Sequence, residues 1–108
     1  MDKKYVDVSI FIQGILREDN KSKEIILRIA NKEFTGVTSV LSWDELVFIV
    51  EKFLGRDLAL TSGKKFFTLP NIEFIDAKKE IILTAQKLME KYKIQPRDAI
   101  HSATALYS

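Results

Sequence analysis

Three carboxylates that lie far apart in the chain, Asp7, Glu45 and Asp98, are the candidates for chemistry in this sequence. Asp7 is expected at the end of the first strand, Glu45 early in the helix after the second strand, and Asp98 early in the last helix. Ligands of parallel α/β sheets bind beyond the carboxyl ends of the strands, so these acids can converge on one cleft. Clustered carboxylates repel one another, but a divalent cation reverses that repulsion. The set therefore indicates a hard metal ion that can activate water for attack on a phosphoryl group.

Each acid also has a structural explanation that needs no ligand. Residues 42–45, Ser-Trp-Asp-Glu, fit the capping-box pattern, in which Glu45 bonds back to the start of its own helix. Asp98 is expected at a helix start, where the helix dipole favours an acid by about 0.3–1 kcal/mol. Asp7 could cap the first helix, but its apolar neighbours predict a buried setting in which its charge needs a partner. Spacing alone leaves both interpretations open.

The composition of the 108 residues excludes several kinds of site. The chain has no cysteine and a single histidine, His101, which excludes disulfides, thiolate zinc sites, cysteine nucleophiles and any site with two histidines. The 17 Lys and Arg against 15 Asp and Glu give a net charge of +2, without the block of like charge typical of a nucleic-acid-binding arm. No apolar run approaches the roughly 20 residues of a membrane span, and the first residues lack a secretory signal. We therefore expect one globular domain in the cytoplasm, with no membrane partner.

Alternating strands and helices are expected to position the acids. Runs of β-branched and aromatic residues predict strands, and apolar residues three and four positions apart predict amphipathic helices. The expected strands are 5–8, 34–38 and 72–75, and the expected helices are 9–17, 22–32, 42–54, 56–67, 77–92 and 96–106. Ser9 and Asp76 are the expected caps of two helices, and Pro96 suits the first position of the last one. This order predicts an α/β fold with a short parallel sheet flanked by helices.

Three stretches of the chain share a pattern with a known protein family. Residues 5–9, Tyr-Val-Asp-Val-Ser, contain an acid at the end of a strand and a hydroxyl two residues later. Residues 38–46, Thr-Ser-Val-Leu-Ser-Trp-Asp-Glu-Leu, contain a hydroxyl pair and then a glutamate. Residues 97–106, Arg-Asp-Ala-Ile-His-Ser-Ala-Thr-Ala-Leu, form the most specific of the three motifs. In this order they resemble the PIN domain family, specifically its VapC-like toxins, and the resemblance implies a single three-layer PIN-like domain over residues 1–108.

The resemblance implies a metal-dependent endoribonuclease that hydrolyses RNA phosphodiester bonds as the toxin of a toxin–antitoxin pair. It assigns the binding of Mg²⁺ or Mn²⁺ to Asp7, Glu45 and Asp98. It places the hydroxyls of Ser9 and Thr38 where family members bond a metal-bound water or a carboxylate. It also implies an RNA substrate, a small antitoxin protein as partner and a homodimer.

The sequence departs from the family pattern at its C-terminal end. The family has a fourth acid on or just after a strand that follows the last motif, and this strand–helix unit is expected to be missing beyond Ser108. Loss of one ligand weakens metal binding, so an alternative is a catalytically impaired PIN-like domain that pairs with a protein without cleaving RNA. A receiver-type phosphoacceptor domain with Asp76 as acceptor is a further alternative, although Asp7 has no second acid beside it.

Several other side chains have two interpretations each. His101 shares a helix face with Asp98 and is expected to pack or hydrogen-bond rather than to act as a base. Arg56, Lys64 and Lys65 could contact RNA phosphates, but a solvated face is the favoured interpretation. Five aromatic residues are expected in the core or in a dimer contact rather than in base stacking. They are Trp43, Phe48, Phe53, Phe66 and Phe67.

Overall fold

The computed structural model describes residues 2–108, and in this range it contains a three-stranded sheet and six helices. All strand pairs are parallel, and the central strand is the second in sequence. The strands are β1 (Lys3–Tyr5), β2 (Thr35–Ser39) and β3 (Ile72–Ile75). This architecture confirms the expected α/β fold with a short parallel sheet between helices.

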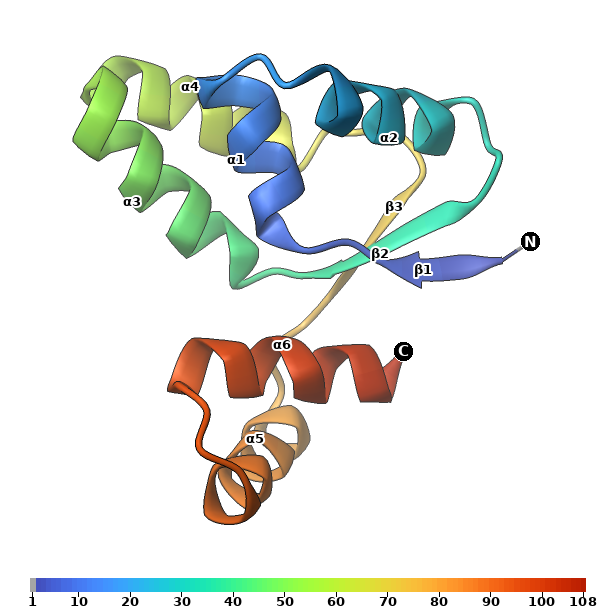
Figure 1. Cartoon of the computed structure of the whole chain (residues 1–108), viewed down its shortest axis with the longest axis vertical. Coiled ribbons are helices and arrows are strands. Elements are labelled where there is room, and N and C mark those ends of the chain that lie inside the picture. The colour runs from blue at the N-terminus through green and yellow to red at the C-terminus, as the bar shows by residue number, and fades with distance from the viewer. Residues whose placement is uncertain (1) are drawn as a thin grey trace.

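The helices form two layers, one on each side of the sheet. The helices are α1 (Val8–Leu16), α2 (Asn20–Ala30), α3 (Ser42–Leu54), α4 (Arg56–Phe66), α5 (Lys79–Lys91) and α6 (Pro96–Tyr107). Figure 1 shows α1 to α4 together on one side of the sheet and α5 and α6 on the other. A pair of helices in each connection between strands lets consecutive strands run parallel and covers one face, and α5 and α6, which follow β3, cover the other. Within residues 2–108, no helix is long and apolar enough to cross a membrane.

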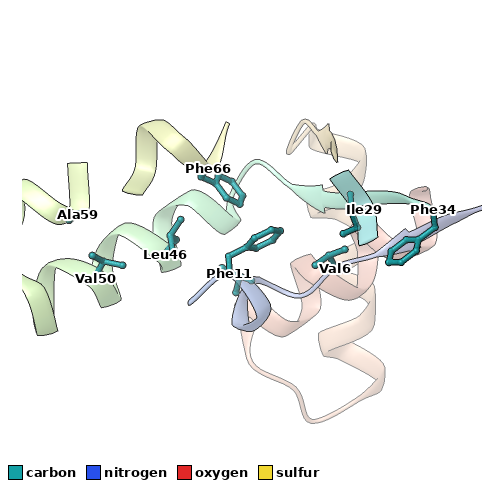
Figure 2. Packing of buried hydrophobic residues seen from close by; sticks show 9 residues of the cluster. Val6, Phe11, Ile29, Phe34, Leu46, Val50, Ala59 and Phe66 are labelled. Atoms are coloured by element: carbon teal, nitrogen blue, oxygen red, sulfur yellow. The ribbon is translucent and has the colours of Figure 1, made fainter. Parts of the chain in front are cut away.

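The apolar core consists of two clusters that correspond to these two helical layers. The larger cluster contains side chains of α1 to α4, and Figure 2 shows Phe11 of α1 and Phe66 of α4 near its centre. Their rings meet edge to face with centroids 5.2 Å apart. The smaller cluster joins Val37 of β2 to α5 and α6. Burial of one such phenylalanine contributes about 1.5–3 kcal/mol, so α1 and α4 are held firmly against each other.

The first strand is shorter than expected. The prediction of a strand over 5–8 is wrong, because β1 ends at Tyr5 and α1 begins at Val8. Asp7 rather than Ser9 is the N-cap of α1, and its carboxylate accepts a hydrogen bond from the Ser9 backbone N–H at 3.3 Å. The apolar residues on both sides of the cap are buried, so apolar patterning could not reveal where the strand gives way to the helix.

Two other helix starts also differ from the prediction. α2 begins before residue 22, because Asp19 is its N-cap and accepts bonds at 2.9 Å from both the backbone N–H and the hydroxyl of Ser22. α5 begins at Lys79 with Lys78 as N-cap, so the prediction that Asp76 caps this helix is wrong. The other boundaries lie within two residues of those expected, and β3 and α3 have the expected ends.

The hairpin of α3 and α4 turns at Gly55 and exposes most of its aromatic residues. Gly55 has φ +92°, a conformation that residues with a side chain rarely adopt, and it both ends α3 and precedes α4. Phe66 is buried, as expected for the core, whereas four other aromatic residues are exposed, which leaves for them the other half of the expectation, a dimer contact. These four are Trp43, Phe48, Phe53 and Phe67.

Candidate functional site

Elements from both ends of the chain meet at the carboxyl edge of the sheet. Tyr5 at the end of β1 pairs with Val37 of the parallel β2, so the two strands end at the same edge. α3 begins three residues beyond β2, and α6 packs against β2 from the other helical layer. Side chains of β1, α3 and α6 can therefore meet there although they are distant in sequence (Figure 1).

A chain of hydrogen bonds joins Tyr5, His101 and Glu45 at this edge. The Tyr5 Oη lies 2.6 Å from His101 Nδ1, and His101 Nε2 lies 2.8 Å from Glu45 Oε1. A carboxylate only accepts, so Nε2–H donates to Glu45, and Nδ1 of the neutral ring accepts from the Tyr5 hydroxyl. The side chains of His101 and Glu45 are only 15% and 21% exposed. The structure thus confirms the expected hydrogen-bonding role of His101.

The Tyr5 hydroxyl is held in its protonated form. Burial is the main cause that raises the pKa of Tyr5 to about 12, and the carboxylates of Asp7 and Glu45 act in the same direction. Hydrogen bonds with the Thr38 side chain and the Ser39 backbone act in the opposite direction. Asp7 follows Tyr5 by two residues, and Glu45 is linked to Tyr5 through His101.

The start of α3 does not form the capping box that residues 42–45 predict. Leu41 is the N-cap and makes no side-chain cap bond. The Ser42 hydroxyl instead lies 3.1 Å from the Thr38 hydroxyl, and both residues are fully buried. Because Glu45 bonds His101, the capping interpretation of Glu45 is wrong.

Glu45 and Asp98 line a common cleft of about 530 Å³ between the starts of α3 and α6. Asp98 lies in the first turn of α6, as expected, and Pro96 occupies the start of the helix. Arg97 lines the same cleft and pairs with Asp44 at 3.4 Å. Both partners are well exposed, so this pair adds little stability and leaves the guanidinium accessible to an anion.

Asp7 lies two residues beyond the end of β1 and does not line this cleft. Its side chain is exposed, which corrects the expectation of a buried setting, and it caps α1. Ser9 lies in the first turn of α1, where its backbone N–H is the donor to Asp7. Thr38 lies at the end of β2, in contact with Ser42.

The donor chemistry of the cleft fits a hard divalent cation. Within residues 2–108, no group of three or more histidine, aspartate or glutamate side chains is arranged to hold a metal ion. The structure brings Glu45 and Asp98 into one cleft, but within residues 2–108 it does not bring Asp7 to them as one ligand group. Mg²⁺ is commonly held by one or two carboxylates together with waters and substrate phosphates. Glu45 and Asp98 are therefore ligands of the type that such an ion prefers.

Sequence reasoning missed the role of Tyr5 and of Arg97. Tyr5 was expected only as a strand residue, yet it bonds the only histidine of the chain. The sequence signal that could have indicated this role is the position of Tyr5 at the end of a strand, two residues before the candidate acid Asp7. Arg97 precedes Asp98 directly, so its position at the cleft follows once Asp98 is placed there.

A second, apolar cavity of about 470 Å³ lies on the other side of the helical layer, between α1, α2 and α4. Phe11, Ile26 and Leu58 are among its apolar lining residues. Lys23 and Lys65 also line it, so the cavity combines an apolar interior with two cations. This combination suits a peptide with apolar anchors and acidic neighbours.

Comparison with known proteins identifies the fold independently of the site. The model of one protein family, described as PIN domain, matches residues 4–108. No curated protein matches the sequence.

Several solved structures are similar to this chain. DNA-bound VapBC from Salmonella typhimurium has 17% identity and a TM-score of 0.74, and the match covers 97% of this chain and 80% of that one. VapBC2 from Rickettsia felis, bound to a promoter DNA fragment, has 17% identity and a TM-score of 0.72 over the same shares of the two chains. Mycobacterium tuberculosis VapC20, a toxin that cleaves the sarcin–ricin loop, has 14% identity and a TM-score of 0.70 over 92% of this chain and 78% of that one. At these identities the similarity concerns the fold.

Proposed function

Because this chain belongs to the PIN domain family, we propose that it is a metal-dependent endoribonuclease and the toxin of a toxin–antitoxin pair. The observation that carries the proposal is the cleft shared by Glu45 and Asp98. Solved relatives of the same fold are toxins and toxin–antitoxin complexes, which supports this assignment. The family match also argues against the receiver-type alternative.

Asp7, Glu45 and Asp98 would hold Mg²⁺ or Mn²⁺ at this edge of the sheet. Such an ion, when bound, lowers the pKa of a water and stabilises the charge that develops on a phosphodiester. The hydroxyls of Ser9 and Thr38 would orient a carboxylate or a water by hydrogen bonding. Arg97 lines the cleft and would contact an RNA phosphate, which adds affinity without reading the base.

The proposed partner is a small antitoxin that inserts apolar side chains into the cavity between α1, α2 and α4. The apolar lining with Lys23 and Lys65 supports an occupant with apolar anchors and acidic neighbours. A homodimer through the exposed aromatic residues of α3 is proposed as well, since Phe48 and Phe53 are 54% and 64% exposed. The cytoplasm is the proposed location, where an RNA substrate is available.

Cleavage of ribosomal RNA by the full chain in Mg²⁺ or Mn²⁺ tests the function. We expect cleavage that stops with a chelator and falls to near background in Asp7→Asn and Asp98→Asn. Asp57→Asn is the matched control, because Asp57, like Asp98, is an acid in the first turn of a helix. It should retain full activity. Cleavage that survives the chelator, or equal loss in Asp57→Asn, would contradict the proposal.

The alternative function is a PIN-like domain that pairs with a protein partner without cleaving RNA. It is favoured by one observation, the lack of a three-ligand metal group within residues 2–108. Calorimetric titration with Mn²⁺ separates the two functions. Binding that disappears in Asp98→Asn contradicts an inactive site, whereas no detectable binding together with partner capture supports the alternative.

A further inference from the structure

Among the three candidate acids, Glu45 is hydrogen-bonded by His101, a side chain from the other helical layer. The His101 contact crosses from α6 to α3 and spans 56 residues of sequence. Asp7, by contrast, is bonded by a backbone N–H two residues away in its own helix. The carboxylate of Glu45 is therefore oriented by tertiary structure rather than by local geometry.

A second hydrogen bond joins His101 to Tyr5 of the first strand. The Tyr5 hydroxyl contacts His101 Nδ1 across 96 residues of sequence, and their rings are 6.1 Å apart with a 59° tilt. A histidine with a single donor on its second nitrogen has a defined tautomer, because the nitrogen that accepts cannot also carry the proton. The Glu45 carboxylate only accepts, so the proton of the neutral ring lies on Nε2, the nitrogen that faces Glu45, and Nδ1 accepts from the Tyr5 hydroxyl.

We propose that Tyr5 and His101 are positioning residues that fix the Glu45 carboxylate for binding a divalent cation at the cleft. This inference rests on the proposed function. A single N–H holds Oε1, and Oε2 remains on a side chain that lines the cleft beside Asp98. Removal of a residue that hydrogen-bonds a metal-binding side chain typically lowers the metal affinity by about 10–100-fold.

The order of effects follows from the order of the contacts. His101→Ala removes the donor to Glu45 and should weaken Mn²⁺ binding about tenfold or more. His101→Gln retains an N–H at a similar reach and should recover part of that affinity. Tyr5→Phe leaves His101 in place but removes the group that selects its tautomer, so a smaller loss is expected. Tyr92→Phe, which removes an exposed tyrosine hydroxyl, should change nothing.

The experiment combines Mn²⁺ calorimetry with ¹⁵N NMR of the imidazole in the full chain, with thermal unfolding as a check that each variant folds. Because the chain has one histidine, its ring signals need no assignment. We expect the Nε2–H tautomer in the wild type and a mixture in Tyr5→Phe, both without metal. An Nδ1–H tautomer in the wild type, or equal Mn²⁺ affinity in His101→Ala and the wild type, would overturn the positioning role alone. No Mn²⁺ binding by the wild type would overturn the proposed function and this inference together.

Discussion

Trp43 of α3 lies directly against Gly63 of α4. A Cβ placed on Gly63 would lie 2.6 Å from the indole Nε1 and 2.8 Å from Cγ2 of Val47. Both distances are shorter than van der Waals contact, so the two helices approach as closely as they do only because this residue has no side chain. The glycine that weakens the α4 pattern in the sequence is thus a requirement of helix packing.

We expect Gly63→Ala to destabilise the protein. Overpacking costs about 1–3 kcal/mol, which exceeds the gain of about 1 kcal/mol that alanine brings to a helix interior. Gly14→Ala in α1 is the matched control, because its Cβ would lie 3.6 Å from Ile26 Cδ1, an ordinary contact. Gly14→Ala should be neutral or stabilising. Urea unfolding measures both, and a shift in the fluorescence of the single tryptophan reports whether Trp43 moves. Equal stabilisation by both substitutions would refute this packing argument.

Asn71 joins two segments before β3 and is expected to be sensitive to an isosteric change. Its φ is +59°, and its Nδ2 donates to the carbonyl oxygens of Ile29 and Phe34, each at 3.0 Å. Asn71→Asp replaces this donor with an oxygen that faces two other oxygens, and should cost about 1–3 kcal/mol of the free energy of unfolding. Asn71→Gly retains the backbone conformation and loses only the bonds, so its loss should be smaller. Denaturant unfolding at neutral pH measures the free energy of unfolding of both variants, and we expect Asn71→Asp to be the less stable of the two.

Asp19, the N-cap of α2, should contribute to the loss of folding stability at low pH. The backbone N–H and hydroxyl of Ser22 lower the pKa of Asp19 below its ordinary value of 3.8. A carboxyl whose pKa is lower in the folded state stabilises the protein above the unfolded pKa, and this contribution is lost as the pH falls through the folded pKa. Asp19→Asn retains a capping oxygen without a titrating group. Melting temperatures from pH 7 to pH 2 should therefore fall less steeply in Asp19→Asn, and parallel curves would exclude the effect.

Two leucines of α4 test the apolar cavity as the antitoxin site. Leu58 and Leu60 are 50% and 51% exposed, but only Leu58 lines the cavity. We expect Leu58→Asp to abolish capture of the proposed antitoxin, because the acid would be buried against apolar groups on binding. Leu60→Asp should bind as the wild type does, and both variants should fold. Equal capture by the two variants would place the partner elsewhere.

The sequence by itself determined the kinds and order of the elements. The pattern of β-branched residues in 72–75 and the apolar repeat of 42–54 lie entirely within short windows, and the structure has the same bounds for β3 and α3. Pro96 likewise marks the start of α6, because its fixed φ suits that position. Such signals are local, since each depends only on neighbours along the chain.

Tertiary structure alone decided which of several equally suitable polar groups acts at each place. Asp7 or Ser9 could cap α1, and Glu45 could bond back to the start of α3 in a capping box. Asp and Ser satisfy a helix start about equally well, so spacing cannot separate such alternatives. Packing of α6 on β2 brings His101 to Glu45 and Tyr5, and no local pattern encodes a contact between residues 5, 45 and 101.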